Sequence, residues 1–523
     1  METPLTPLEF ARRARKLYPE REAVVDGGLR LTYEDFFSRC DRCSGALQRL
    51  GVRHGDRVAY ISPNTHMHLE SFYAVPQIGA VLVPINFRLT VNDFEYIINH
   101  CGAEIVCVHS DYLEALDTIR TKLTKVRHFV TLEGTSDGWL EYEHLLGSEG
   151  TSFDPAPIDE RDLLTINYTS GTTSRPKGVM ITHRNAYINT VGTLIHVPMT
   201  CAERYLWTLP MFHCNGWTFT WTVTAVGGAH ICLRKIDPGL IFDLIERESI
   251  SLMCAAPTVL IALANAPVEI RRRSRTPLRV VTAGAPPAAV TIQRVENELG
   301  WELIQAYGLT EASPFLTVCE PRPAHEQLSS DARARIKARQ GVELITSGEV
   351  RVVDPDGNEV PCDGQGLGEI VARGNVVMQG YYNDPEATAR ALQGGWFHTG
   401  DAAVVHPDGY VEIRDRFKDV IISGGENISS VEVEGVLLGH PAIVEAAVVG
   451  VPDAKWGEVP HAFVVLRSGV SVAPQELREF VRSRLAHFKT PRDFTFVTEL
   501  PKTATGKIQK YVLREGRSAI STQ

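Results

Sequence analysis

The chain has 523 residues, of which 44% are hydrophobic, and a formal net charge of -10 at pH 7. This length exceeds what one hydrophobic core usually organises, so more than one domain is expected. The charge is modest and the basic residues are scattered, which argues against a nucleic acid or an anionic membrane surface as the main partner.

The N-terminal segment has no apolar core of signal-peptide length, and no apolar run in the chain approaches the ~20 residues that span a bilayer. The ten cysteines lie at irregular spacings, which fits reduced thiols better than a disulfide framework. Cys40 and Cys43 form an isolated CxxC without a second pair at zinc spacing, so we expect them to pack in a core. A soluble, cytoplasmic protein without integral membrane association is expected.

Short apolar runs rich in β-branched residues alternate with helix-like segments. The runs cover residues 58–61, 105–108, 231–233 and 279–282, and the helix-like segments include residues 35–50 and 288–299. This alternation predicts an α/β fold in layers. Near residue 400 the sequence becomes turn-rich, and a compact pattern of strands and helices follows. We expect a large N-terminal domain of several α/β subdomains, residues 1–416, and a small mobile α+β C-terminal domain, residues 417–523.

The segment YTSGTTSRPKG, residues 168–178, gathers five hydroxyl side chains, two glycines, an arginine and a lysine. Glycine lets backbone amides approach an anion closely, hydroxyl groups donate hydrogen bonds, and Arg175 and Lys177 add positive charge. The segment therefore favours a polyphosphate ligand, although its order is not that of a Walker A loop. A plain flexible surface loop is the alternative. The residues expected at the phosphates are Thr169, Ser170, Gly171, Thr172, Thr173 and Lys177.

Further motifs follow in the order found in the adenylate-forming superfamily of acyl-CoA synthetases, peptide-synthetase adenylation domains and luciferases. They are AYGLTE at residues 306–311, FHTGD at 397–401, RDRFKDVIISGGENIS at 414–429 and PKTATGKIQK at 501–510. Together with the loop at residues 168–178, these motifs extend over nearly the whole chain. The chain therefore resembles this superfamily. PMFHCNGW at residues 210–217 makes it most similar to AMP-forming ligases for short- or medium-chain, methylthio-alkanoic or aromatic acids, such as methylthiopropionate-CoA ligase. Ser174 and Lys510 depart from the more common glycine and arginine.

The resemblance implies an ATP site. Tyr307 is expected to stack on adenine, Thr310 to touch the α-phosphate, and Glu311 to hold Mg²⁺, which prefers carboxylate oxygen. Asp401 and Arg416 resemble the pair that contacts the ribose hydroxyls. Taken alone, Tyr307 could equally be a core aromatic residue and Asp401 a turn residue. The residues that resemble the turn bordering both adenine and the acyl group are Gly284, Ala285 and Pro286.

The resemblance also assigns residues to two half-reactions, the formation of acyl-AMP and the transfer of the acyl group to CoA. Lys507 is expected to bridge the substrate carboxylate and the α-phosphate as charge shifts between them, whereas a solvated lysine is the alternative. Gly424 and Gly425 are expected to line the passage for the CoA thiol, with Trp456 packed on the cofactor. Lys418, two residues after the ribose-binding arginine, is the expected hinge.

The acyl site is expected around PMFHCNGW. By resemblance His213 gates the site and Trp217 forms its wall, although a histidine in an apolar stretch is more often a core residue. Gly308 is expected to leave room beside Tyr307 for an acid longer than acetate, and Gly284 to border the same space. The sequence offers no partner for a second substrate charge, which favours a largely apolar acid.

These expectations describe an acid-thiol ligase that uses ATP, Mg²⁺ and coenzyme A. A carboxylate and ATP give acyl-AMP and pyrophosphate, and CoA then gives acyl-CoA and AMP. The expected catalytic residues are Lys507, Thr310, Glu311 and His213. Three alternatives stay open: transfer of the acyl group to a carrier protein or an amine, an oxygenase of the luciferase type, and a non-catalytic binder of acyl-AMP or a nucleotide. A homodimer is also left open.

Overall fold

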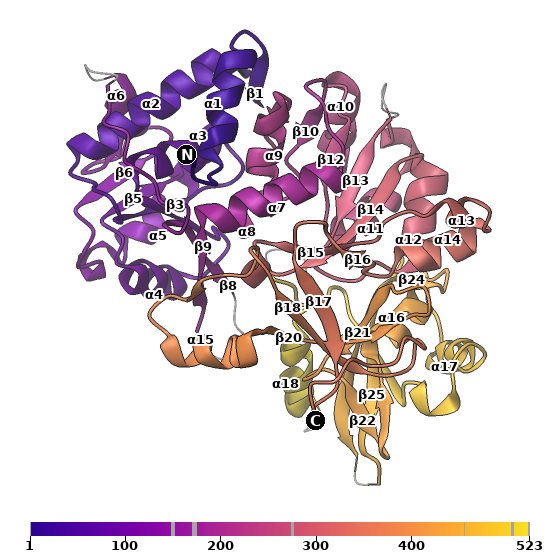
Figure 1. Ribbon diagram of the computed structural model, residues 1–523. Helices are drawn as coiled ribbons and strands as arrows, with labels where there is room; N and C mark the ends of the chain where they lie inside the picture. Colours follow the sequence, from indigo (N-terminus) through magenta and orange to yellow (C-terminus); the bar gives the residue numbers. More distant parts are fainter. Residues whose placement is uncertain are drawn as a thin grey trace.

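The computed structural model describes residues 2–147, 152–169, 175–272, 277–453, 455–503 and 507–520. Within these ranges the strands form four sheets, and helices pack around the two largest (Figure 1), which confirms the predicted α/β class. The helices are α1 Leu8–Leu17, α2 Tyr33–Arg49, α3 His66–Ala74, α4 Val91–Cys101, α5 Leu113–Asp117, α6 Tyr142–Gly147, α7 His183–His196, α8 Cys214–Trp217, α9 Phe219–Val226, α10 Pro238–Arg247, α11 Pro257–Ala264, α12 Ala289–Arg294, α13 Pro323–Glu326, α14 Ser330–Lys337, α15 Pro385–Ala391, α16 Ser430–Leu438, α17 Pro474–Arg482 and α18 Lys510–Ile520.

An eight-stranded sheet contains the predicted strands at residues 58–61 and 105–108. Its strands are β3 Arg57–Ile61, β4 Val81–Ile85, β5 Ile105–Val108, β6 His128–Thr131, β7 Leu140–Glu141, β8 Leu163–Thr169, β9 Lys177–Thr182 and β19 Gly380–Tyr381. Their order is β19-β9-β8-β4-β3-β5-β6-β7, and β3 runs parallel to β4 and β5. These central strands are buried on both faces, which explains their continuous apolar runs.

The other large sheet has nine strands. Its strands are β1 Glu22–Asp26, β2 Leu29–Thr32, β10 Arg204–Leu206, β11 Ala229–Ile231, β12 Leu252–Cys254, β13 Arg279–Thr282, β14 Glu302–Gly308, β15 Phe315–Val318 and β16 Val342–Glu343, in the order β16-β15-β14-β13-β12-β10-β11-β1-β2. The run at 279–282 is a strand as predicted. The strand expected at 231–233 is present but lies two residues earlier, as β11 Ala229–Ile231. The helix expected over 288–299 is α12 followed by a π-helical turn, Val295–Leu299.

Two smaller sheets meet where the chain passes residue 420. The first is antiparallel, in the order β17 Glu349–Val353, β18 Gly368–Arg373, β20 Phe397–Val405 and β21 Val411–Arg416. The second contains β22 Ile421–Ser423, β23 Glu426–Ile428, β24 Ile443–Asp453, β25 Gly457–Leu466 and β26 Asp493–Phe496. The predicted division after residue 416 falls between β21 and β22, and the domain boundary itself stays a prediction.

The clusters of buried apolar side chains are also separate before and after residue 420. In the described residues, three clusters draw only on residues 10–413, and two draw only on residues 421–513. A cavity of about 280 Å³ lies between the two parts, with Gly364, Gln365 and Leu367 on one side and Glu432 and Lys489 on the other. The residues after 420 form the lower part of the molecule in Figure 1.

All ten cysteines are free, and Cys40 and Cys43 are buried, as expected for core residues. Cys362 is exposed, Cys201 is partly exposed, and the others are buried. In the part of the chain that the structure describes, no helix combines the length and the apolar character needed to cross a membrane.

Candidate active site

Two neighbouring strands bring Asp401 and Arg416 together. These residues are direct partners in the pairing of β20 with β21, and Arg416 Nε lies 3.1 Å from Asp401 Oδ1. Tyr307, near the end of β14, donates its hydroxyl to Asp401 Oδ2 at 2.7 Å. Burial and the carboxylate of Asp401 raise the pKa of Tyr307, so its hydroxyl stays a donor. The structure thus brings Tyr307 to two predicted residues that follow it by more than 90 positions in the sequence.

Glu311 is held by a tyrosine that the sequence interpretation missed. Tyr381 Oη donates to Glu311 Oε1 at 2.9 Å, and Lys177 Nζ lies 4.8 Å from the centre of the same ring. Pairing of β19 with β9 places Tyr381 opposite Val179 and so brings its ring to Lys177. Burial raises the pKa of Glu311, while the hydrogen bond from Tyr381 and the charge of Arg416 oppose that shift.

The surroundings of Glu311 fit Mg²⁺ that arrives with ATP. Among the described residues no group of three acidic, histidine or cysteine side chains could hold a metal ion alone. Mg²⁺ is commonly held by one or two carboxylates together with substrate phosphates. Glu311 can supply the carboxylate, and the buried Thr310 beside it can supply a hydroxyl group. A complex of Mg²⁺ with ATP therefore suits this site better than a free metal ion.

The expected phosphate loop is bracketed by β8 and β9. Thr169 and Lys177 are partners in this antiparallel pair, so the ends of the loop start side by side. Directly after β9, Thr182 and Asn185 form a capping box that begins α7. The remaining predicted phosphate-binding residues, Ser170, Gly171, Thr172 and Thr173, lie outside the described residues.

Lys507 comes from the far end of the chain and lies within the electrostatic reach of Arg416 and Asp401. Neighbouring protein atoms take water away from its ammonium group and lower its pKa to about 8, with Arg416 adding to the effect, although the residue keeps access to solvent. The negative charge of Asp401 raises the pKa of Lys507 and so opposes this shift. Two hydrogen bonds hold the residue, because Thr503 N donates to Lys507 O at 2.7 Å and Lys507 N donates to Thr503 Oγ1 at 3.1 Å.

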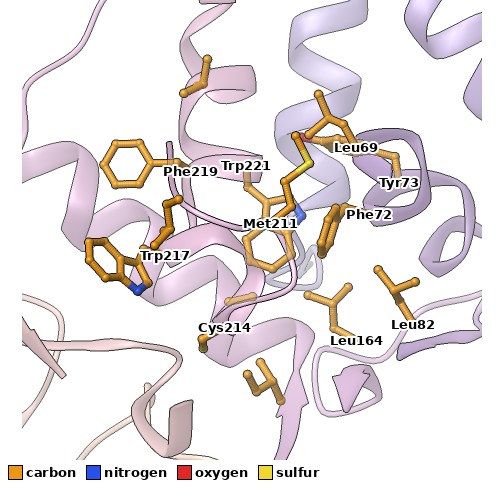
Figure 2. Packing of buried hydrophobic residues seen from close by; sticks show 14 of the residues in the cluster. Leu69, Phe72, Tyr73, Leu82, Leu164, Met211, Cys214, Trp217, Phe219 and Trp221 are labelled. Carbon is orange, nitrogen blue, oxygen red and sulfur yellow. The ribbon is translucent and has the colours of Figure 1, made fainter. Parts of the chain in front are cut away.

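His213 lies within the electrostatic reach of Lys507. Burial, together with the charge of Lys507, lowers the pKa of His213 to about 4, so the imidazole is neutral at pH 7. The rings of His213 and Trp217 are 6.5 Å apart, and Trp217 meets Phe315 edge-on at 5.8 Å. In Figure 2 the Trp217 ring lies apart from the side chains of Met211, Phe72 and Trp221, which pack together.

The glycines predicted to border the acyl site differ in their surroundings. Gly284 is exposed with a φ of +87°, and a Cβ there would lie 3.7 Å from Trp217 Cζ2, so this turn faces the indole. Ala285 and Pro286 continue it and are partly buried. The expectation of free space at Gly308 is wrong in the direction of a side chain. A Cβ on Gly308 would lie 1.8 Å from the carbonyl oxygen of Pro314, so backbone fills that position.

Gly424, Gly425 and Trp456 form a cluster of their own. Gly424 N donates to Trp456 O at 2.8 Å, and a Cβ on Gly424 would lie 2.7 Å from Trp456 Cε3, so the indole lies directly on the glycine backbone. The indole is 46% exposed. Within the described ranges, no hydrogen bond, ion pair or ring contact joins this cluster to Glu311 or Lys507. Lys418, in the segment between β21 and β22, is exposed.

Two family models match most of the chain. Residues 10–382 match the family model of the AMP-binding enzyme, and residues 432–507 match that of the AMP-binding enzyme C-terminal domain. Among curated relatives, 4-hydroxybutyrate-CoA ligase 2 of Metallosphaera sedula and 2-methylpropanoate-CoA ligase CCL4 of Humulus lupulus are each 42% identical, over 98% of this chain and 95% of their own. Trans-cinnamate:CoA ligase, peroxisomal, of Petunia hybrida is 39% identical over 98% of this chain and 94% of its own.

Among solved structures, the anthranilate CoA ligase AuaEII in complex with anthranoyl-AMP superposes with a TM-score of 0.89 at 25% identity, over the full length of both chains. The two family models together account for most of the sequence, in the same order in which the structure arranges its cores. The chain therefore belongs to the AMP-binding enzyme family.

Proposed function

We propose that this chain is an AMP-forming carboxylic acid:CoA ligase. A substrate carboxylate attacks the α-phosphorus of ATP and releases pyrophosphate, and the thiol of CoA then attacks the acyl-AMP and releases AMP. The observation that carries the proposal is the convergence of Lys507 with Asp401 and Arg416, which come from parts of the chain after and before residue 420. This convergence puts a cation beside the proposed ribose-binding pair.

The first half-reaction brings two anions together. With a pKa of about 8, Lys507 is mainly an ammonium ion at neutral pH and can hold the substrate carboxylate against the phosphate while negative charge passes to the leaving pyrophosphate. His213 is neutral at this pH, so it can donate one hydrogen bond to the carboxylate without adding a second charge. Asp401 and Arg416 hold the ribose and thereby fix the position of the α-phosphorus.

The phosphates occupy the space beside Glu311 and Lys177. Mg²⁺ bound with ATP neutralises phosphate charge there, and Glu311 and Thr310 are its expected protein contacts. Lys177 stays beside the ring of Tyr381 and faces the same phosphates. Tyr307 supplies the aromatic surface for adenine while its hydroxyl remains bonded to Asp401.

The second half-reaction requires a different face of the small C-terminal part. Gly424, Gly425 and Trp456 offer a backbone turn without side chains and an exposed indole to the pantetheine arm of CoA, but they form a cluster separate from Lys507. Rotation at Lys418, in the short segment that joins two sheets and two cores, exchanges this cluster for Lys507 at the acyl-AMP.

The proposed acid is small or of medium length, largely apolar, and aliphatic, methylthio-alkanoic or aromatic. Trp217, Phe315 and the Gly284 turn supply apolar surface beside His213. Relatives named for 4-hydroxybutyrate, 2-methylpropanoate and trans-cinnamate lie within this range of sizes. Transfer to a carrier protein or an amine stays the competing reaction, and a cytoplasmic location and a homodimer stay predictions.

Two measurements on one panel of acids test the proposal. Acetate through decanoate, benzoate, cinnamate and methylthiopropionate are each incubated with ATP and Mg²⁺, with and without CoA. Pyrophosphate release that depends on the acid tests adenylation, and thioester formation tests the acceptor. Pyrophosphate release without any thioester would favour a carrier protein or an amine as the acceptor. The absence of both products with every acid contradicts the proposal.

A further inference from the structure

The chain makes a left-handed turn at the proposed acyl site. Five successive residues have positive φ: Cys214 at 31°, Asn215 at 48°, Gly216 at 57°, Trp217 at 52° and Thr218 at 69°. Only one of them is glycine, and non-glycine residues normally visit this region singly because each loses energy there. A run of such residues persists only where the surroundings determine it, which is a condition typical of functional sites.

A closed ring of hydrogen bonds holds this turn. Thr165 Oγ1 donates to Asn167 Oδ1 at 2.7 Å, Asn167 Nδ2 donates to Asn215 Oδ1 at 3.1 Å, and Asn215 Nδ2 donates to Thr165 Oγ1 at 2.9 Å. The three side chains are at most 2% exposed. Asn167 also donates to the carbonyl of Phe212 at 3.3 Å, so the ring holds the segment on both sides of His213. Buried amides are costly unless bonded in this way.

A second contact fixes the turn from its other side. A Cβ on Gly216 would lie 2.4 Å from Trp207 Cζ3, so the turn fits tightly against that indole. Asn64, which is buried, donates to the carbonyl of Trp207 at 2.8 Å and accepts from Met211 N at 2.8 Å. The turn therefore lies between two sets of buried asparagine hydrogen bonds.

We propose that Asn215, Asn167 and Thr165 are positioning residues for acid selectivity. They hold the left-handed turn so that Trp217 faces Gly284, and they tie it to β8, the strand that leads into the phosphate loop. They act through Trp217 and His213 rather than by touching the acid. This inference rests on the proposed function, and it adds residues to which the acid-binding role had not been assigned.

Two variants break the ring in different ways. Thr165→Val removes the shared hydroxyl and keeps a β-branched strand residue, while Asn215→Gly removes the amide and keeps a residue that accepts positive φ. The matched control is Thr131→Val, which removes a buried hydroxyl from β6 of the same sheet, where it donates to Glu133 O at 2.7 Å. Any general loss of stability appears in the control as well.

Both ring variants are expected to raise the KM for the preferred acid by about tenfold or more and to change the ranking of acids by kcat/KM, with the KM for ATP changing far less. Thr131→Val should lower the melting temperature without changing that ranking. The inference is overturned if both ring variants keep the parent's ranking and acid KM.

Crystal structures of the parent and of Asn215→Gly provide a readout that does not depend on activity. The inference expects Trp217 to leave its place beside Gly284 in the variant, and an unmoved Trp217 contradicts it. If the parent activates none of the acids, the proposed function fails by itself, and the position of Trp217 still decides whether the ring holds the turn.

Discussion

Arg467 Nη1 donates a hydrogen bond of 2.8 Å to Asn265 Oδ1. Arg467 directly follows β25, and Asn265 directly follows α11, so this bond joins the two parts of the chain in the arrangement that brings Lys507 to Asp401. Rotation at Lys418 would have to break it. The bond therefore favours the arrangement that we propose for the first half-reaction.

Arg467→Ala is expected to slow adenylate formation by about tenfold or more while leaving thioester formation from supplied acyl-AMP unchanged or faster. The reason is the loss of one hydrogen bond from a charged donor, worth about 1.5–3 kcal/mol, from one of two arrangements. Rapid-quench assays of the two half-reactions measure the ratio. Arg492→Ala is the control, since Arg492 pairs with Asp453 inside the small part. Equal slowing of both steps by Arg467→Ala contradicts the assignment.

Lys507→Ala should reduce adenylate formation by about 100-fold or more, because the cation at the developing charge is lost. Thioester formation from pre-made acyl-AMP should be largely retained. Lys502→Ala is a matched control five residues earlier, where the lysine pairs with Glu445 at 2.6 Å. If Lys507→Ala impaired both half-reactions equally, the lysine would have a structural role instead.

We expect the pH dependence of the first half-reaction to follow the protonation of Lys507. Its pKa is lowered to about 8, and only the protonated form can bridge two anions. The kcat/KM for the acid should therefore be constant below about pH 7 and fall by up to about tenfold per unit as the pH rises above 8. In Lys507→Arg this decline should disappear below pH 10, because guanidinium keeps its proton. A decline at the same pH in the arginine variant rules the lysine out as its cause.

Tyr381→Phe should weaken the use of Mg²⁺ and ATP. The variant keeps the ring beside Lys177 but removes the hydrogen bond to Glu311, and a bond to a charged group is worth about 1.5–3 kcal/mol. The KM for the Mg²⁺–ATP complex is expected to rise about tenfold, and Mn²⁺ binding in the presence of ATP, followed by electron paramagnetic resonance, should weaken in parallel. Tyr382→Phe, one residue later, should leave both quantities unchanged. A normal Mn²⁺ titration in Tyr381→Phe refutes this prediction.

Gly308→Ala should destabilise the protein by about 1–3 kcal/mol without a shift in acid preference. The added Cβ would meet the Pro314 carbonyl rather than an acyl group. Gly435→Ala is the contrasting control, because that glycine is in α16 with no atom within 4 Å of an added Cβ, and alanine favours helices. Chemical denaturation gives the free energies of unfolding. A variant of normal stability that prefers shorter acids would restore Gly308 as a wall of the pocket.

The sequence predicted those features in which local pattern and function coincide. Apolar runs located β3, β5 and β13, and the motifs pointed to Asp401, Arg416 and Tyr307, which the fold does bring together. The sequence did not reveal the role of Tyr381, because its partner Glu311 is 70 positions away. A tyrosine in a turn-rich stretch gives no sign of such a partner. The pairing of β19 with β9, which brings it there, depends on long-range contacts.

The buried asparagines escaped for a related reason. An asparagine inside a core has the same letter as one on a surface, and only the partners of Asn64, Asn167 and Asn215 distinguish them. One local signal was available, since Asn215 and Gly216 form an Asn-Gly pair, which is typical of residues with positive φ. At Gly308 a motif comparison suggested space, whereas the carbonyl of Pro314 takes that position after a loop closes.

The exposure of Cys362 gives spectroscopy a point of attachment without any change to the sequence. Eight other cysteines are buried and Cys201 is only partly exposed, so a maleimide or nitroxide reagent will modify Cys362 first. This thiol lies two residues before Gly364, which lines the cavity that faces Glu432 and Lys489 across the boundary between the two parts. A spin label there is attached close in sequence to that cavity, and a change in its tumbling during turnover would report the proposed movement of the small part.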